Sequence, residues 1–360
     1  MIPQSHFDLV VIGGGPGGCS AAISAARKGA SVLLLERSVF PRHKVCGEFV
    51  SPESLPLLQE LLGNEKFETL QSLAIVRVEI SAGAQNFHIP VMPAASSITR
   101  FILDNALWEA AVISGAVCKQ KVAASQVSGE GPFKITTSQG DFSAQTVIDA
   151  TGRWSNLNAA VETSASKLLG IKGHFCGNSR NNIVHLYFFA GGYCGIQPLQ
   201  GGRVNVCAMV RADAASKLDQ VFALHPQLLA ESRDWTPLMD PVYTSPLIFR
   251  EPNPALGSVL RVGDAAGFVD PFTGDGIALA LHSGKVAADN ILPFINGRCT
   301  LQVAVNGYRK AYSQQLLPVF RGSSFLRHIM MSPQIVRRFA FLLMRIPAFA
   351  HMAIKKTRIA

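Results

Sequence analysis

The stretch Phe7-Asp-Leu-Val-Val-Ile-Gly-Gly-Gly-Pro-Gly-Gly18 decides the fold. It begins as a short apolar run typical of a buried β-strand and ends in a turn made almost entirely of glycine. An alanine-rich run over residues 19–28 then predicts a helix, and a second apolar run over residues 31–35 ends in Glu36. Strand, glycine turn, helix, strand and acid within about 30 residues are the fingerprint of a dinucleotide-binding unit.

Each of these residue types has a physical task at a phosphate site. Gly13 permits a tight turn, Gly15 lets the backbone approach a pyrophosphate, and Gly18 lets the helix pack close to the strand. The helix start presents free N–H groups and a positive dipole end to the phosphates. Glu36 can accept hydrogen bonds from both ribose hydroxyls, and its charge would repel a 2′-phosphate.

Two later segments favour FAD over NAD as the dinucleotide. Residues 146–153 read as a strand that runs into a turn of small residues, and a second such strand ends in Gly263-Asp264. The Asp264 carboxylate can accept a hydrogen bond from a ribityl hydroxyl. The backbone of residues 274–276, at the start of a helix expected over 277–290, can donate to the flavin's pyrimidine edge.

At these residues the chain resembles the flavoprotein superfamily of para-hydroxybenzoate hydroxylase, the flavin-dependent halogenases and the geranylgeranyl reductases. The resemblance covers most of residues 5–300 and is closest to the geranylgeranyl reductases, whose distal segment reads much like residues 263–276. That branch also has a P-x-x-Y-x-C element, which here is Pro41, Lys44 and Cys46, with lysine in place of tyrosine.

The resemblance implies an α/β fold (α+β overall). A Rossmann-like FAD-binding domain, like that of para-hydroxybenzoate hydroxylase, would carry an inserted antiparallel β-sheet substrate domain and a C-terminal helical segment. Arg42 and Cys46 would lie near the isoalloxazine, and Arg100, at the head of a helix expected over 101–114, near the phosphates. The full set of expected FAD-binding residues is Gly13, Gly15, Pro16, Gly17, Gly18, Glu36, Arg37, Arg42, Cys46, Gly47, Arg100, Asp149, Ala150, Thr151, Gly152, Gly263, Asp264, Pro271, Gly274, Asp275, Gly276 and Ile277.

Between the nucleotide motifs the sequence is rich in strand patterns. We expect hairpins from 75–80 with 85–91 and from 133–137 with 141–148, strands at 183–190, 193–197 and 203–210, and a helix over 214–230. The expected FAD-binding domain comprises residues 1–73, 94–165 and 250–300, and the β-rich substrate domain residues 74–93 and 166–249. A basic amphipathic helical segment follows over 301–360.

The substrate pocket is expected on the aromatic strand near residue 187. His185, Tyr187 and Phe189 would share one strand face and could line a hydrophobic cavity, although both faces could equally be core. Geranylgeranyl reductases line their lipid tunnel with a Y-x-W-x-F-P element. Here Tyr193 and Pro198 keep its ends while the tryptophan and phenylalanine are lost, which weakens the case for a polyprenyl substrate.

Three flavin chemistries share this scaffold. Reduction of a C=C bond needs hydride from the flavin and a proton donor, for which Cys46, Tyr193 and His43 are candidates, although Cys46 could equally be a small buried hydrophobe. Aromatic hydroxylation ranks second. Halogenation ranks third because the W-x-W-x-I-P element is missing.

The chain has no second G-x-G-x-x-G unit, so NAD(P)H would dock transiently or a reduced partner protein would supply electrons. A non-enzymatic prenyl- or lipid-binding escort protein of the same wider fold is a further alternative. Such a protein would be expected to lose Glu36, Asp264 or the glycine turn, and this chain keeps all three.

The net charge of +9 is concentrated at one end of the chain. Residues 298–360 hold eleven Lys and Arg and no acid, so residues 1–297 carry 9 − 11 = −2. Val336, Phe339, Leu343 and Ile346 would share one helical face. This segment could pack on the body, lie on an anionic membrane surface, or meet an acidic carrier protein that presents a tethered hydrophobic substrate. Nucleic acid is not expected, because the arginines alternate with large apolar residues.

The cysteine and hydropathy patterns indicate the cellular compartment. The seven cysteines contain no C-x-x-C pair, and no metal site is expected. The N-terminus lacks the features of a signal peptide, and no apolar run reaches the roughly 20 residues of a membrane span. We expect a cytoplasmic protein, either free or peripheral at the inner membrane face.

Overall fold

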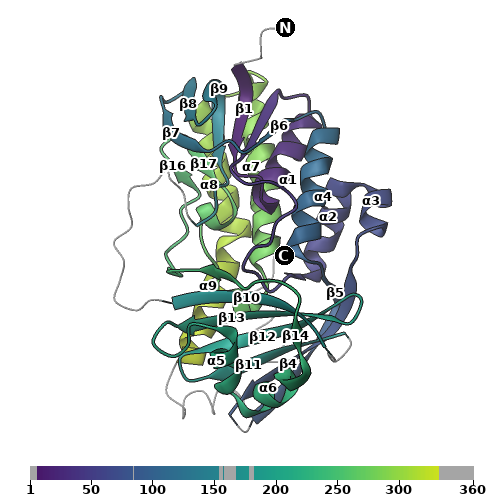
Figure 1. Cartoon of the computed structure of the whole chain (residues 1–360). Coiled ribbons are helices and arrows are strands. Elements are labelled where there is room, and N and C mark those ends of the chain that lie inside the picture. Colours follow the sequence, from purple (N-terminus) through teal and green to yellow (C-terminus); the bar gives the residue numbers. More distant parts are fainter. Residues whose placement is uncertain (1–5, 84, 154–156, 158–167, 178–181, 332–360) are drawn as a thin grey trace.

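The chain folds around two β-sheets that face a common cavity (Figure 1). The computed structural model describes residues 6–83, 85–153, 157, 168–177 and 182–331. The first sheet and its helices form the upper part of Figure 1, and the second sheet forms the lower part. The architecture is mixed α/β, as the sequence predicts.

The first sheet carries the glycine turn. Its central strands run parallel in the order β17 (Val259–Arg261), β9 (Gly140–Asp149), β1 (His6–Ile12), β2 (Val32–Glu36) and β6 (Val117–Gln120). β16 (Ala255–Leu256) pairs with β17, and β8 (Phe133–Thr137) joins β9 to β7 (Ala124–Ser128), all antiparallel. β2 is buried at every position, which explains why it reads as one continuous apolar run.

Helices α1 (Pro16–Ala26), α4 (Arg100–Ile113) and α7 (Gly276–Ile295) pack beside this sheet, close to the expected ranges. α1 and α7 approach so closely that a Cβ on Gly284 would lie 2.2 Å from the carbonyl oxygen of Gly17. Thr99 caps α4 by accepting a hydrogen bond from the Ile102 N–H. The remaining helical elements of this part are η1 (Pro52–Ser54), α2 (Leu55–Leu62), α3 (Asn64–Glu68), η3 (Gly263–Ala265) and η4 (Pro271–Thr273).

The second sheet is antiparallel except for one parallel pair. Its order is β14 (Thr236–Pro237), β10 (Leu168–Cys176), β13 (Arg203–Arg211), β12 (Gly192–Leu199), β11 (Ile183–Phe189), β4 (Leu73–Ala82), β5 (Gln85–Ser97) and β3 (Phe49–Val50), with β15 (Val242–Thr244) also on β10. β4 and β11 run parallel, so the sheet is not purely antiparallel as expected. Parallel pairing is open to them because a long crossover through the first sheet separates them along the chain.

Residues 214–230 form two short helices and not the single helix expected. α5 (Leu218–Ala223) ends before His225, and α6 (Pro226–Glu231) starts anew, followed by η2 (Ser232–Asp234). Pro226 has no N–H to continue the first helix, and it restricts the preceding His225 to extended backbone (φ −140°, ψ 121°).

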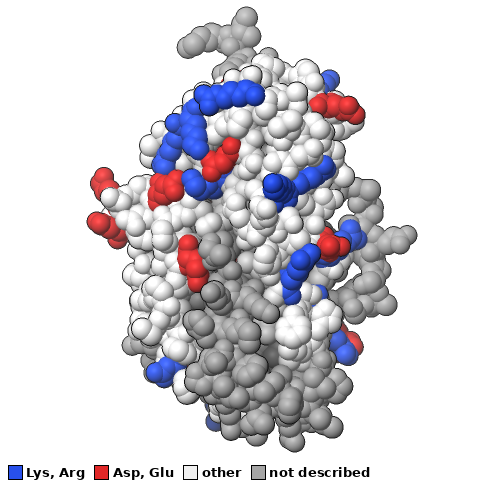
Figure 2. Space-filling view, turned by 180° about the vertical axis from the view of Figure 1, so that it is seen from behind, with Lys and Arg blue, Asp and Glu red and all other residues white. Residues whose placement is uncertain are grey.

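The first half of the basic C-terminal segment packs on the body. α8 (Leu301–Gln315) buries Tyr308, whose hydroxyl donates to the Arg261 carbonyl at 2.7 Å, and α9 (Leu317–Met331) buries Val319. The expected apolar face over 336–346 lies outside the described residues. On the face seen in Figure 2, the Lys and Arg side chains of the described residues stand among Asp and Glu. No described helix is both long and apolar enough to cross a bilayer.

The contact between α1 and α7 generates a stability prediction. Gly284→Ala should lower the free energy of unfolding by about 1–3 kcal/mol, because the added methyl group meets the backbone of Gly17 and Ala21 and cannot be accommodated by a rotamer change. Denaturant unfolding measures the change. Lys285→Ala, on an exposed position of the same helix, is the control and should shift stability by less than about 1 kcal/mol; equal losses would contradict the prediction.

Candidate functional site

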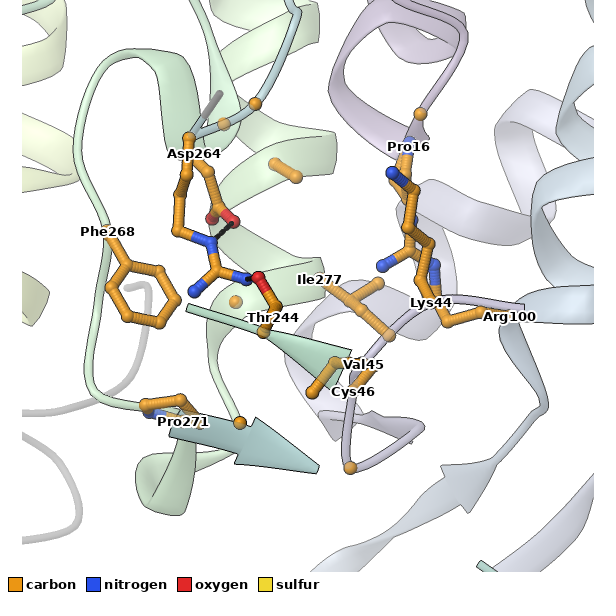
Figure 3. A pocket seen from close by; sticks show the side chains of 18 of the residues that line it. Pro16, Lys44, Val45, Cys46, Arg100, Thr244, Asp264, Phe268, Pro271 and Ile277 are labelled. Atoms are coloured by element: carbon orange, nitrogen blue, oxygen red, sulfur yellow. Dashed lines mark hydrogen bonds and ion pairs between the residues drawn. The ribbon is translucent and has the colours of Figure 1, made fainter. Parts of the chain in front are cut away.

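A cavity of about 810 Å³ lies between the two sheets. Its walls come from the glycine turn, residues 42–49, the turn after β9, the stretch from η3 to the start of α7, and the inner face of the second sheet. In Figure 3, Lys44 and Arg100 lie beside Pro16 on one side, and Asp264 and Phe268 on the other, with Cys46 between them. The volume suits an extended organic ligand.

The glycine turn leaves space in front of α1. Gly13 has φ +114°, and a Cβ there would lie 2.2 Å from the Ala150 carbonyl oxygen; on Gly18 it would lie 1.8 Å from the Gly13 oxygen. A Cβ on Gly15 would meet only the Arg100 guanidinium, 4.0 Å away. Gly15 is the N-cap of α1, and no side chain caps the helix. On the side of Gly13 and Gly18 the turn packs against backbone. On the side of Gly15 there is room for an anion to approach the backbone.

Glu36 fixes the turn from the end of β2. Its carboxylate accepts hydrogen bonds from the N–H groups of Gly14 and Ser38, both at 2.9 Å, and from Arg42 at 3.2 Å. Burial alone would raise the pKa of Glu36, but Arg42 and the two N–H donors outweigh it and hold that pKa below its usual value. Glu36 therefore stays ionised at neutral pH and lines the cavity.

Three cations gather near Gly15 with too few acids to neutralise them. Arg100 pairs with buried Asp104 at 2.6 Å, and Arg42 lies 3.7 Å from the same carboxylate. Burial, with help from Arg42 and Arg100, lowers the pKa of Lys44 to about 8. Nε and Nη1 of Arg42 are buried and have no hydrogen-bond partner among the described residues. The phosphates of a dinucleotide would supply the missing negative charge, so these residues fit FAD.

The opposite end of the cavity is built around Arg153 and Asp264. Arg153 Nε lies 3.6 Å from the Asp264 carboxylate, and its guanidinium stacks over the Phe268 ring at 4.3 Å (Figure 3). Gly274 adopts a left-handed conformation (φ +77°), which turns the chain into α7 against Phe49.

Most of the expected FAD-binding residues line this cavity, and three do not. Gly18 lies behind the turn, Asp149 accepts hydrogen bonds from the Thr151 N–H and hydroxyl, and Asp275 is the N-cap residue of α7. These three shape the turns beneath the cavity surface.

All three candidate proton donors line the cavity. The Tyr193 hydroxyl is buried and has no hydrogen-bond partner in the described part of the chain; burial, reinforced by Asp270, raises its pKa well above 10. Burial and the nearby Lys172 and His174 lower the pKa of His43. The Cys46 sulfur accepts the Glu48 N–H at 3.3 Å.

The expected aromatic face of β11 points away from the cavity, which corrects the substrate-pocket prediction. His185 pairs with Glu79, and Tyr187 donates to Glu231 of α6, so both lie on the far side of the sheet with Phe189. Because side chains alternate along a strand, Val184 and Leu186 line the cavity instead. Tyr193 lines it as expected, whereas Pro198 is buried without lining it.

Sequence reasoning missed a set of buried polar residues at the cavity wall. Glu48 and Gln197 line the cavity, and Lys172, His174 and Asn205 lie behind them. One signal was available. Lys172 and His174 sit two apart in an otherwise apolar strand, which places both on one face. The sequence holds no comparable sign that Glu48 is their partner.

Comparison with known proteins agrees with this site. Residues 8–160, which include the glycine turn and Glu36, match the family model described as FAD dependent oxidoreductase. This chain is an FAD-dependent oxidoreductase. The proteins similar to it include both reductases and halogenases.

Curated relatives of this oxidoreductase fall into both groups. The flavin-dependent halogenase rdc2 of Metacordyceps chlamydosporia is 27% identical over 350 residues, 83% of this chain and 67% of the halogenase. The digeranylgeranylglycerophospholipid reductase of Methanosarcina mazei is 27% identical over 321 residues (79% and 75%). The menaquinone reductase of Mycobacterium tuberculosis is 26% identical over 322 residues (80% and 77%). This chain therefore spans about two thirds to three quarters of these relatives.

Solved structures share the fold of the oxidoreductase. The flavin-dependent brominase Bmp2 superposes with a TM-score of 0.82 at 20% identity, covering 98% of this chain and 93% of the brominase. A geranylgeranyl bacteriochlorophyll reductase-like protein of Thermoplasma acidophilum gives a TM-score of 0.74 at 20% identity, with coverage of 91% and 88%.

The low pKa of Lys44 predicts that FAD affinity falls at alkaline pH. Phosphates favour the charged lysine, so the pKa of Lys44 should rise above 8 in the complex. Below pH 8 the free protein already holds this proton. Above pH 8, binding must take it up, and the FAD dissociation constant should rise by up to about tenfold per pH unit.

Fluorescence titration of the flavin-free protein with FAD at several pH values between 7 and 9.5 measures this dependence. Lys44→Met should bind FAD more weakly at pH 7 and lose most of the dependence above pH 8. The same slope in the variant and the wild type would show that another group is responsible.

Proposed function

We propose that this oxidoreductase reduces a C=C bond of a hydrophobic molecule by hydride transfer from FAD. The observation that supports this most is the Tyr193 hydroxyl, a buried group of the cavity lining that has no hydrogen-bond partner among the described residues. Its ring packs against Phe188 at 5.4 Å and Phe272 at 6.0 Å between ring centres. A buried hydroxyl without a protein acceptor is costly unless a ligand supplies the acceptor.

The reaction adds one hydride and one proton across the double bond. Reduced FAD supplies the hydride when it is bound. Tyr193 keeps its proton at neutral pH because its pKa is raised, so it can release that proton only to a strongly basic carbon or oxygen that develops during the reaction. Solvent would then reprotonate it. His43 suits this task less well, because its lowered pKa leaves it neutral at pH 7.

The electron donor belongs to the same proposal. NAD(P)H would dock transiently, or a reduced partner protein would deliver electrons. The substrate would be a free hydrophobic molecule or one tethered to a carrier, and Val184, Leu186, Met209 and Leu247 give its chamber apolar walls.

Oxygen-dependent chemistry is the second candidate, because proteins named as halogenases are among those similar to this chain. Halogenases occur among both the sequence relatives and the similar structures, so the missing W-x-W-x-I-P element does not set halogenation aside. An aromatic hydroxylase would use the same oxygen-dependent half-reaction.

Anaerobic photoreduction of the FAD-loaded protein separates these functions. Reoxidation without oxygen by a hydrophobic alkene that carries no quinone group, with the saturated molecule as product, is the expected result. Reoxidation only by oxygen, with oxygen or a halogen appearing in a phenolic product, would contradict the reductase proposal and support the second candidate.

Tyr193→Phe should slow anaerobic reoxidation by alkene roughly 100-fold or more, because the proton donor is lost, while FAD occupancy stays normal. Stopped-flow absorbance of the flavin measures the rate. Tyr312→Phe, buried in α8 and not among the residues that line the cavity, is the matched control and should react at the wild-type rate. A wild-type rate for Tyr193→Phe would remove Tyr193 from the mechanism.

We also propose that residues 333–360 dock the protein on an anionic membrane surface, as their basic, apolar sequence suggests. Deleting them should reduce sedimentation with phosphatidylglycerol vesicles and leave FAD occupancy and sedimentation with phosphatidylcholine unchanged. Unchanged binding to phosphatidylglycerol would refute this role.

A further inference from the structure

A buried ionic cluster joins the cavity wall to the second sheet. Glu48 and Lys172 are fully buried, and His174 nearly so. One Glu48 carboxylate oxygen accepts a hydrogen bond from Lys172 Nζ, and the other lies 2.9 Å from His174 Nε2. Lys172 and His174 belong to β10 of the second sheet, whereas Glu48 ends the segment that walls the cavity.

Glu48 holds an unfavourable backbone conformation at this point. Its φ is +64°, in the left-handed region that residues with a side chain seldom adopt. The backbone around it is tied on several sides: the Glu48 carbonyl accepts from Ile98 N–H and from Gln197, and its carboxylate also accepts the Arg100 N–H at 2.8 Å. Such a conformation persists only where the surroundings fix it.

These contacts reach both ends of the proposed cofactor site. Cys46, Gly47 and Glu48 line the cavity, and the Asn205 side chain of β13 donates to the carbonyls of Cys46 and Gly47 at 3.1 and 2.9 Å. Arg100, whose N–H rests on Glu48, carries the guanidinium that faces Gly15. A shift of Glu48 would therefore move the wall and the start of α4 together.

Lys172 does not line the cavity, and Glu48 is its hydrogen-bonding and ion-pair partner among the described residues. A buried lysine is retained at a large desolvation cost, and Lys172 itself does not reach a ligand in the cavity. Its hydrogen bond to Glu48 is the contact through which it can position the cavity wall.

We propose that Lys172 is a positioning residue that acts through Glu48 to fix the 46–48 wall and the start of α4 in the FAD-binding geometry. This inference rests on the proposed placement of FAD in the cavity. It assigns the second sheet a part in cofactor binding in addition to enclosing substrate.

A double-mutant cycle on FAD affinity tests the proposal. The full chain is stripped of flavin and titrated with FAD as wild type, Lys172→Met, Glu48→Gln and the double variant. Each single variant should bind FAD about tenfold more weakly, the scale seen when outer-shell partners of other bound groups are removed. The double variant should bind no more weakly than Glu48→Gln, because Lys172 has no task once the carboxylate is gone.

The visible circular dichroism of bound FAD, measured at saturation, supplies a readout that a purely structural role would not move. Its bands should change in Lys172→Met and stay unchanged in Lys285→Met, which breaks only the exposed pair with Glu60. If Lys172→Met does not fold, the proposal is still tested by comparing the FAD affinities of Glu48→Gln and the double variant. Replacing both partners of a buried pair is better tolerated than removing one.

Two results would overturn the proposal: a further loss of FAD affinity in the double variant beyond that of Glu48→Gln, or lowered thermal stability with unchanged affinity and dichroism. If the proposed placement of FAD in the cavity is wrong, the result is different: the wild-type chain would show no saturable FAD binding.

Discussion

Backbone-to-backbone contact at glycine is the constraint on which the structure depends. Gly13 touches the turn after β9, Gly18 touches Gly13, and Gly284 brings α7 against the first turn of α1. Three segments far apart in the sequence thereby meet at one helix terminus. A single methyl group at any of these positions would separate them, so the same residues determine both the packing of helices on the first sheet and the shape of the turn before α1.

The electrostatics of the cavity depend on how few acidic side chains lie beside its cations. Asp104 is shared by Arg100 and Arg42, and Glu36 is already bound to backbone N–H groups, so Lys44 is left in a partly desolvated site beside two other cations. Burying like charges together is unfavourable in the free protein. Phosphates in the cavity would relieve this repulsion, so the excess of positive charge favours the binding of an anion.

The nucleotide half could be predicted from sequence because its information is local. The glycine turn, Glu36 and the motif at Gly263-Asp264 each lie within a short stretch whose spacing reflects one turn or one strand. The second sheet is harder to predict from sequence. Alternation along β11 showed that two faces exist, but which of them meets the cavity depends on neighbours from distant segments, and the aromatic face of Tyr187 packs on α6 instead.

The Glu48–Lys172 pair is beyond sequence reasoning for the same reason, since 124 residues separate its members. A charged residue in an apolar strand signals a buried partner without identifying it. The prediction of a single helix over 214–230 is wrong for a different reason. The helical pattern is present, but Pro226 divides it into two short helices.

The second sheet is assembled from pieces of chain that alternate with pieces of the first. β3, β4 and β5 precede α4, whereas β10 to β15 follow β9, and the parallel pairing of β4 with β11 joins the two groups. Such a sheet cannot be exchanged as one continuous segment, because elements of the first sheet lie between its strands in the sequence. A change of substrate in a protein with this architecture would therefore come from replacing side chains at alternate positions, such as Val184 and Leu186, on a backbone that stays the same.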